Sequence, residues 1–302
     1  METFNWNQYL LNYEDLRKAG IKSRQMAVKH FVLFGRAEGR TDKSNRKYNV
    51  LIKRLLPEQL NIKEPLPKLI ASKLPLSVDL RSMFPPCYDQ GQLGSSTANA
   101  IVGAYQYLKP SFMGSRLFLY YNERDIEHSV NVDAGAYVHD GITSLEKNGM
   151  CPESLWPYNI SQFATKPPES CYTSALTHKV LKSYSVSSTL NAMKKLLSSG
   201  IPFIVGISVF SSFESIQAIN SGLVPYPKSN EISIGSHCVL SVGFSDTVRC
   251  PNAPAGSFIF RNSWGSRSGE QGGYGINGYG FIPYGYLINP ELSSDNWYIT
   301  IS

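Results

Sequence analysis

The chain has 302 residues, of which 42% are hydrophobic and 17% are charged. These proportions are those of a folded protein with one large or two ordinary domains, and they argue against a disordered chain. No apolar run reaches the length of a membrane span, and METFNWNQYLLNYEDLRK lacks the basic start and apolar core of a signal peptide. We therefore expect no membrane span and no unaided secretion, and we favour a cytoplasmic or virion-associated protein.

The net charge of +6 is distributed unevenly. Residues 1–75 hold 15 Lys and Arg against 7 Asp and Glu, whereas residues 76–302 hold 14 against 16. The basic first quarter could contact nucleic acid or an anionic membrane, or it could dock on the rest of its own chain. Its basic residues are scattered among apolar ones without a nucleic-acid motif, so we expect no nucleic-acid partner.

The five cysteines form no CxxC pair, which leaves a zinc site with little support. We expect no metal and no other cofactor. The odd count leaves one thiol unpaired, and the favoured interpretation is mostly free, buried thiols, with a Cys151 to Cys171 bridge as the open alternative. The cysteines are Cys87, Cys151, Cys171, Cys238 and Cys250.

Residues 5–41 are predicted to form a module of two helices. In SRQMAVKHFVLFGR, Ser23 can cap a helix, apolar residues follow at helical spacing, and Gly35 can end it. His30 lies beside this apolar stripe, and we interpret it as a packed histidine rather than a catalytic one. YLLNYEDLRKAGI and AVKHFVLFGRAEGR resemble a short module of giant-virus proteins and some bacterial surface proteins. This resemblance points to a giant virus as the source but assigns no chemistry to the module.

A polar, basic and then proline-rich stretch from Asp42 to about Leu74 reads as a connector, because its prolines forbid long regular elements. A new globular unit starts near LPLSVDLRS. We therefore divide the chain into residues 1–75, a helical module with its connector, and residues 76–302.

In the second unit, STANAIVGAYQYL predicts a helix that starts at Ser96, and STLNAMKKLLSSG predicts another that stops at Gly200. IPFIVGISVF, HCVLSVGFS and SFIFRNSWG are short, rich in β-branched and aromatic residues, and separated by turn formers, so they are predicted strands. Helices followed by strands indicate an α+β architecture in two lobes.

The start of the helix at Ser96 is the predicted reactive position. The positive end of the helix dipole favours an anion there, and the backbone N–H can point at an oxyanion. Gln90 lies six residues earlier in a glycine-punctuated loop, where its amide could supply a second oxyanion donor. Taken alone, Gln90 reads as a loop residue, His237 as a strand residue and Asn262 as a turn former.

Together, DQGQLGSS, GSHCVLSVGF and FIFRNSWG resemble the three signature segments of papain-like cysteine proteases, and the resemblance covers about residues 75–290. It implies a papain-like fold with a helical lobe and a β-barrel-like lobe. It also implies family roles for five positions: nucleophile at Ser96, oxyanion glutamine at Gln90, imidazole at His237, orienting amide at Asn262, and covering tryptophan, next to the substrate, at Trp264. The separation from 96 to 237 falls within the spacing of about 130–150 residues expected for papain-type enzymes, whereas that from 96 to 262 exceeds it. The stretch TVRCPNAPAG could account for the excess.

The sequence also departs from the family pattern. Leu93 and Thr97 stand where the resemblance implies a disulfide cysteine and a tryptophan, and Ser268 stands where a second tryptophan is implied. DAGAYVHDGITSLEKNGMCPESLWPY resembles the segment whose glycine-rich start pairs with the substrate backbone, which makes Gly135 a candidate wall of the substrate groove.

Ser96 is the decisive departure, because a serine hydroxyl beside a neutral histidine does not ionise as a thiol does. The favoured interpretation is the precursor of a cysteine endopeptidase, inactivated by an introduced Cys-to-Ser change, which would act on peptide or protein substrates. The alternatives are a natural pseudoprotease that binds peptides and a structural or adhesive protein built around the N-terminal module. Silicatein-like proteins resemble the case of a natural serine-bearing relative. Residues 1–75 are then either an inhibitory prosegment or a tethering module.

Overall fold

The computed structural model describes residues 4–42, 46–51, 74–180, 182–269 and 272–301. The chain divides into two compact units, Met1–Lys47 and Tyr48–Ser302. Most of the proline-rich connector predicted from sequence, residues 52–73, lies outside the described residues. In the part of the chain that is described, no helix has the length and apolar character needed to cross a membrane.

The first unit contains helices α1 (Trp6–Asn12), α2 (Glu14–Lys18) and α3 (Arg24–His30), followed by a π-helical turn at Phe31–Gly35. The prediction of two helices was wrong, because Tyr13 is extended, with φ −130° and ψ 96°, and interrupts the first one. The predicted cap is confirmed, since the Ser23 hydroxyl accepts a hydrogen bond from the backbone N–H of Met26 at 3.3 Å. His30 is packed as expected, with Nδ1 lying 2.9 Å from the Tyr9 hydroxyl.

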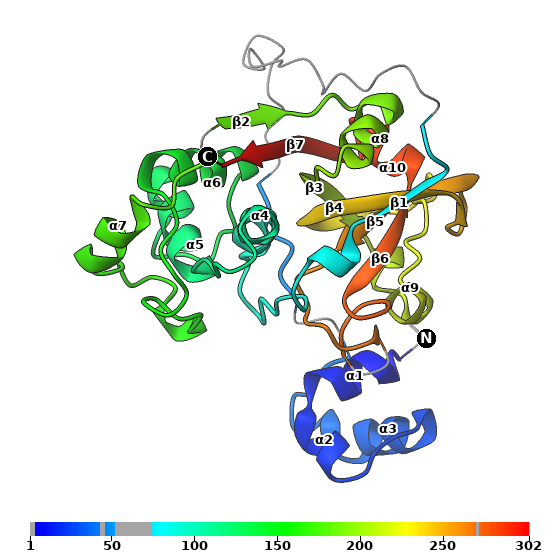
Figure 1. Ribbon diagram of the computed structural model, residues 1–302. Coiled ribbons are helices and arrows are strands. Elements are labelled where there is room, and N and C mark those ends of the chain that lie inside the picture. The colour runs from blue at the N-terminus through cyan, green and yellow to red at the C-terminus, as the bar shows by residue number, and fades with distance from the viewer. Residues whose placement is uncertain (1–3, 43–45, 52–73, 181, 270–271, 302) are drawn as a thin grey trace. The chain divides into compact units, whose positions relative to one another are not determined.

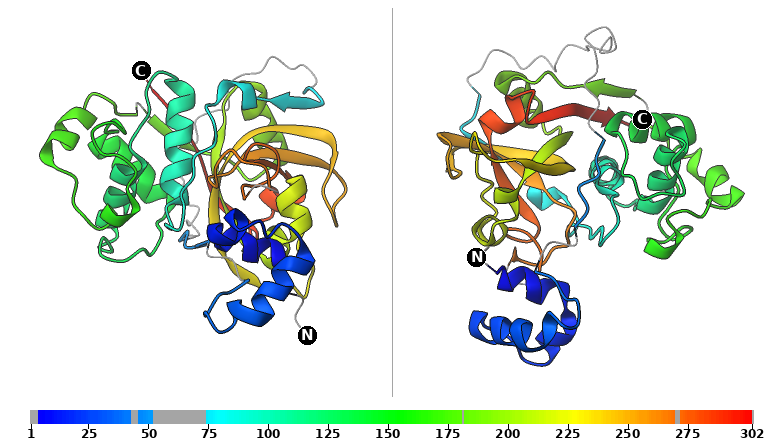
Figure 2. Two further views of the ribbon diagram at one scale, coloured as in Figure 1. Left: turned by 90° about the horizontal axis from the view of Figure 1, so that it is seen from below. Right: turned by 180° about the vertical axis from the view of Figure 1, so that it is seen from behind.

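One group of helices of the second unit lies beside its strands, as the teal and green ribbons of Figures 1 and 2 show. They are α4 (Ser96–Leu108), α5 (Arg116–Ile126), α6 (Val138–Asn148) and α7 (Glu169–Ala175). We call this part the helical lobe. The helix predicted at Ser96 is confirmed with its first residue, and eleven consecutive residues of α4, Ser96 to Gln106, are buried.

The strands form one antiparallel sheet in the order β2-β7-β3-β4-β5-β6, with β1 paired to β4. We call this sheet, with its covering helices, the strand lobe. Its strands are β1 (Ser77–Asp79), β2 (Lys182–Ser185), β3 (Phe203–Phe210), β4 (Ser233–Arg249), β5 (Ala255–Arg261), β6 (Tyr279–Pro283) and β7 (Ser293–Thr300). Its helices are α8 (Leu190–Ser198), α9 (Ile216–Ser221) and α10 (Tyr284–Ile288).

All three predicted strands are confirmed as β3, β4 and β5, and the predicted helix before Gly200 is α8. The α+β prediction is therefore correct. The stretch TVRCPNAPAG spans the hairpin between β4 and β5, but its two ends belong to the strands themselves. All five cysteines are buried and free, so the Cys151 to Cys171 bridge is not formed.

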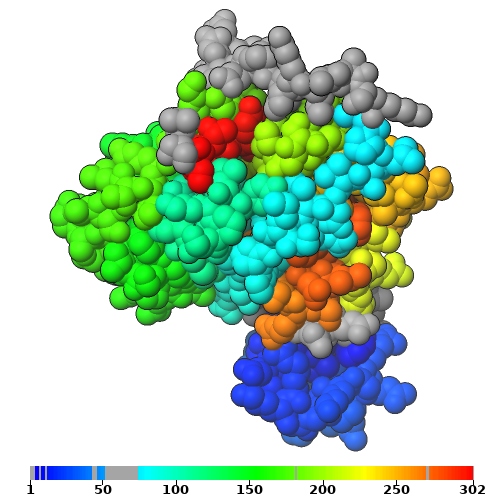
Figure 3. Space-filling view, viewed as in Figure 1, coloured from blue at the N-terminus to red at the C-terminus, as the bar shows by residue number. Residues whose placement is uncertain are grey.

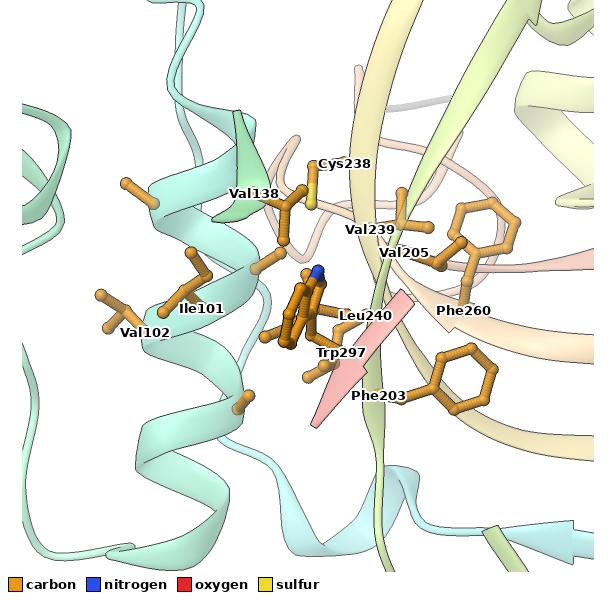
Figure 4. Packing of buried hydrophobic residues seen from close by; sticks show 14 of the residues in the cluster. Ile101, Val102, Val138, Phe203, Val205, Cys238, Val239, Leu240, Phe260 and Trp297 are labelled. Atoms are coloured by element: carbon orange, nitrogen blue, oxygen red, sulfur yellow. The ribbon is translucent and has the colours of Figure 1, made fainter. Parts of the chain in front are cut away.

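The hydrophobic core joins the two lobes. Figure 4 shows α4 beside the strands that carry Val205 and Leu240, with the indole of Trp297 from β7 between the helix and these strands. Ile101, Val205 and Leu240 are at most 1% exposed, and burying an aliphatic side chain of this size stabilises the fold by about 1.5–3 kcal/mol. The two lobes appear as adjoining bodies in the space-filling view (Figure 3). This packing places the first turn of α4 beside β4.

Candidate active site

Ser96 begins α4 and is 2% exposed. Its hydroxyl oxygen accepts a hydrogen bond from the backbone N–H of Cys238 at 3.2 Å, across the junction of the two lobes. Ser95, the N-cap residue, makes no capping hydrogen bond with its side chain. The N–H groups of a first helical turn have no partner within the helix, and they make this end of α4 attractive to a negative charge.

His237 and Asn262 are brought together by strand pairing. His237 lies on β4 opposite Ile207 of β3, and Asn262 directly follows β5. The imidazole Nε2 lies 2.8 Å from Asn262 Oδ1. The same Oδ1 accepts a hydrogen bond from the backbone N–H of Ser263 at 2.8 Å, which identifies it as the amide oxygen. Nε2 is therefore the protonated nitrogen in the neutral ring, and Nδ1 is then the basic one.

Trp264 covers this pair. Its indole stacks on the His237 imidazole with ring centroids 5.2 Å apart and an angle of 28° between the planes. Phe213 and Tyr274 meet the indole edge-on at 5.7 Å and 5.3 Å, and Trp264 is only 4% exposed. The histidine to asparagine hydrogen bond thus lies in an apolar, aromatic enclosure, where hydrogen bonds are stronger than in water.

Gln90 lies in the loop before α4 and is 1% exposed. Its backbone N–H donates to the Ser263 carbonyl at 2.9 Å, and its side-chain Oε1 accepts from the Ser263 hydroxyl. Its Nε2 donates to the Leu93 carbonyl at 2.8 Å, which uses one of the two amide hydrogens. Ser263 therefore ties the Gln90 loop to the segment that carries Asn262, a contact that sequence reasoning missed although Ser263 lies inside the NSWG motif.

A short segment of the chain, Tyr48 to Leu51, bridges the two lobes beside these residues. The Tyr48 carbonyl accepts from the N–H of Ser236, the N–H of Val50 donates to the Ser236 carbonyl, and both distances are 3.2 Å. On the helical side, the N–H of Leu51 donates to the Ala136 carbonyl at 3.1 Å. Nothing in the composition of this segment distinguishes it from the rest of the basic first quarter, so sequence reasoning did not find it.

Two glycines allow the segment to come this close. A Cβ atom on Gly135 would lie 1.6 Å from the Asn49 carbonyl oxygen, and one on Gly235 would lie 2.5 Å from the Tyr48 carbonyl oxygen. Gly135 also has a φ of +78°, which a residue with a side chain rarely adopts. Gly135, the candidate wall of the substrate groove, thus lies against a stretch of backbone. That stretch is the Tyr48 to Leu51 segment of this same chain.

The Tyr48 side chain meets the imidazole and the tryptophan. Its ring contacts those of His237 and Trp264 edge-on, at centroid distances of 6.0 Å and 6.1 Å. Its hydroxyl donates a hydrogen bond to the Glu214 carboxylate. The aromatic ring of Tyr48 therefore packs beside the rings of the candidate site.

Two buried cysteines, Cys238 next to His237 and Cys87 in the segment before α4, are poor nucleophiles. Burial raises the pKa of the Cys238 thiol well above its usual value, and nearby Glu123 and Asp295 raise it further. Burial also raises the pKa of Cys87, although Arg261 opposes this shift. A thiol must ionise to attack, so neither cysteine can replace a nucleophile at position 96.

Comparisons of this chain with a family model, with curated proteins and with solved structures all find cysteine proteases or a protein named as like them. The model of the family described as papain family cysteine protease matches residues 74–278. An uncharacterized peptidase C1-like protein of Acanthamoeba polyphaga mimivirus is 40% identical over 225 residues, which are 70% of this chain and 68% of that protein. Among solved structures, xylellain, a cysteine protease from Xylella fastidiosa, is similar with a TM-score of 0.74 and 34% identity, over 86% of this chain and 98% of xylellain. Digestive procathepsin L 3 of Tenebrio molitor shares the fold with a TM-score of 0.63 and 21% identity, over 98% of both chains.

Proposed function

Because this chain belongs to the papain family of cysteine proteases, we propose that it is the precursor of an endopeptidase that cleaves peptide bonds through an acyl-enzyme at position 96. The hydrogen bond of 2.8 Å between His237 and Asn262 is the main support, since it orients an imidazole one residue before the Cys238 N–H that contacts Ser96. Peptides are the substrates that this family implies.

With a cysteine at position 96, the reaction follows from these positions. His237 Nδ1 takes the thiol proton, and the thiolate attacks the peptide carbonyl to form a carbon–sulfur bond. The carbonyl oxygen becomes an oxyanion, for which the Gln90 amide and the N–H at position 96 are the proposed donors. The imidazolium returns the proton to the amine leaving group, and water then hydrolyses the thioester with His237 as base. Asn262 holds the imidazole in the required orientation.

With Ser96, the first step fails. A serine hydroxyl has a pKa many units above that of a thiol, so no ion pair with His237 forms and the chain cleaves peptides poorly or not at all. The other residues that the family resemblance calls for, including Gln90 and Asn262, are all present in the chain. That completeness supports a single Cys-to-Ser change, introduced into an otherwise working enzyme, over gradual loss of the whole site. The native codon at position 96 decides this point.

The decisive experiment is Ser96→Cys. We expect peptidase activity that thiol reagents abolish, and alkylation by iodoacetamide at position 96 far faster than at Cys87 or Cys238. The matched control is Ser96→Cys combined with His237→Ala, in which fast alkylation should disappear. If the new thiol reacts no faster than the two buried cysteines at mildly acidic pH, the proposed ion pair does not exist.

The second candidate function is a pseudoprotease that binds peptides without cleaving them, and Ser96 itself favours it. It predicts that Ser96→Cys binds peptides as the unaltered chain does and remains inactive. A native serine codon together with an inactive Ser96→Cys variant would establish this alternative.

We further propose that residues 1–75 are an inhibitory prosegment and that residues 76–302 are the peptidase. The contacts of Tyr48 to Leu51 support this division, because they occupy the backbone of Ser236 and Ala136 and cover the His237 ring. The charge contrast between the basic first quarter and the acidic remainder favours docking as well.

This second proposal is tested in the full-length Ser96→Cys protein. Tyr48→Ala removes the ring beside His237 and the hydrogen bond to Glu214, so we expect a higher initial rate of peptide hydrolysis. Removing residues 1–75 should raise the rate further, and adding that segment in trans at low salt should lower it again. Equal rates in all forms, without inhibition in trans, would leave the N-terminal module as a tether or partner-binding module.

A further inference from the structure

The loop that leads into α4 is hydrogen-bonded to a tyrosine side chain of the helical lobe. Tyr158, in the segment between α6 and α7, donates its hydroxyl hydrogen to the Gln90 carbonyl oxygen at 3.0 Å. The same hydroxyl lies 2.5 Å from the Ser95 hydroxyl. One side chain therefore contacts both ends of the loop, at residue 90 and at the residue before position 96.

The direction of these hydrogen bonds can be assigned. Since Tyr158 donates to Gln90, the Ser95 hydroxyl must donate to Tyr158. Ser95 in turn accepts from Asn99, whose Nδ2 lies 3.1 Å from the Ser95 hydroxyl oxygen and 2.8 Å from the Ser95 carbonyl oxygen. A continuous series of donors and acceptors thus runs from Asn99 through Ser95 and Tyr158 to Gln90.

Arg116 fixes the orientation of these hydrogen-bonded side chains. Its guanidinium lies 4.1 Å from the centroid of the Tyr158 ring and donates to Asn99 Oδ1 at 3.3 Å, which turns the amide nitrogen of Asn99 toward Ser95. It also donates to the Asp89 carbonyl at 3.2 Å and to the Glu153 carboxylate at 3.1 Å. Arg116 and Tyr158 therefore bind consecutive carbonyl groups, those of Asp89 and Gln90.

The two proposed oxyanion donors, the Gln90 amide and the N–H of residue 96, are attached to the two ends of this loop. All five cysteines are free, so no disulfide cross-links the loop. We propose that Tyr158 is a positioning residue of the peptidase, whose hydroxyl sets the separation of the two oxyanion donors by bonding to Gln90 and Ser95. This inference rests on the proposed function of the site and adds a residue that the three signature segments do not contain.

Tyr158→Phe removes the hydroxyl and keeps the ring beside Arg116. In the Ser96→Cys background we expect kcat for peptide hydrolysis to fall about 10-fold, less than the 10²–10³-fold expected for loss of a whole oxyanion donor, with little change in KM. Alkylation of the thiol by iodoacetamide should change less than about 2-fold, because that reaction forms no oxyanion and depends on the ion pair alone. A fall in both rates by the same factor, or in neither, would overturn the proposal.

Tyr172→Phe is the matched control. The Tyr172 hydroxyl donates to Asn122 Oδ1 at 3.1 Å in the same lobe, and among the described residues it makes no hydrogen bond with the loop before α4. We expect this variant to leave kcat unchanged. An equal loss of kcat in the two variants would show that Tyr158 acts only through the stability of the lobe.

A measurement without catalysis separates this inference from the proposed function. In the unaltered Ser96 chain, Tyr158→Phe should speed amide hydrogen exchange in residues 89–96 several-fold, whereas Tyr172→Phe should not. An inactive Ser96→Cys variant would contradict the proposed function and leave this result intact. Unchanged exchange in residues 89–96 would overturn the positioning role of Tyr158 whether or not the enzyme is active.

Discussion

The two lobes hold their halves of the candidate site by different means. In the helical lobe, Gln90 and Ser96 lie on a loop and a helix end that receive side-chain hydrogen bonds from Tyr158, Asn99 and Arg116, in addition to the backbone bond of Gln90 to Ser263. In the strand lobe, His237 lies within β4 and Asn262 directly follows β5, so their places depend on backbone pairing.

This difference predicts different responses to substitution. A strand register is all-or-none, because a slip of one residue sends every side chain to the opposite face. A network of side-chain hydrogen bonds can instead lose one member and shift by a fraction of an ångström. We therefore expect graded losses of activity from changes on the helical side. On the strand side we expect small losses as long as the register is kept and His237 itself is unchanged.

The acidic residues of the two lobes also differ. In the helical lobe, burial raises the pKa of Glu123 well above its usual value and that of Glu127 to about 7. In the strand lobe, burial opposes the shift of Asp246, but hydrogen bonds from Lys194 and Tyr284 outweigh it and lower the pKa. Burial thus favours the neutral form of Glu123 and Glu127, whereas hydrogen bonding favours the charged form of Asp246.

The largest expected effect is that of Gln90→Ala in the Ser96→Cys background. Loss of one oxyanion donor should lower kcat by about 10²–10³-fold, with little effect on folding. Initial rates and thermal melting measure the two quantities separately. Gln92→Ala, an exposed position in the same loop, is the control and should be neutral. An unchanged kcat for Gln90→Ala would remove Gln90 from the site.

A smaller effect is expected for Asn262→Ala, because this side chain orients the imidazole without touching the substrate. Trp264 still stacks on the ring at 5.2 Å, so part of the orientation should survive. We expect a loss of kcat of about 10-fold, a fraction of the 10²–10⁴-fold that a positioned acid–base group contributes. A loss as large as that of Gln90→Ala would mean that the strand lobe is no more tolerant than the helical lobe.

The smallest effect is a pH dependence of stability. Glu127 keeps its proton up to a pKa of about 7 in the folded chain, against 4.5 when unfolded. Between these values the folded state binds more protons, so this contribution to stability is present in mild acid and is lost as the pH rises toward 7. Glu127→Gln should therefore reduce the fall in melting temperature between pH 5 and pH 8.

Asp246→Asn is the control for this measurement, because the pKa of Asp246 is shifted in the opposite direction. The lowered pKa of Asp246 contributes stability that is lost only as the pH falls below about 4. Replacing Asp246 should therefore leave the difference in melting temperature between pH 5 and pH 8 unchanged. If Glu127→Gln leaves the difference in melting temperature between pH 5 and pH 8 unchanged, Glu127 ionises normally in the folded chain.

Local sequence was enough to predict the parts of the site that depend on neighbouring residues. The helix that starts at Ser96, the strand that carries His237 and the NSWG segment after β5 could all be read from short patterns, because capping, hydrophobic spacing and turn residues act over a few positions. The candidate roles of Gln90, His237 and Asn262 came from the same three segments.

Other parts depended on contacts between distant residues. Helix α5 was not predicted, and nine of its consecutive residues, Arg116 to Arg124, are buried, among them charged side chains that are usually exposed. Strand β2 pairs with β7, bringing Lys182 opposite Thr300, and no local pattern encodes a partner so far along the chain.

The same reason applies around the site. Tyr158 contacts residues that precede it by more than sixty positions, and Tyr48 contacts Ser236 and His237 from the other end of the chain. The candidate reactive groups were thus named from short sequence segments that resemble those of a known family. The hydrogen bonds from Tyr158 and the packing of Tyr48 on His237 were decided only by the tertiary structure. Such contacts between distant residues form only after the fold has brought them within a few ångströms.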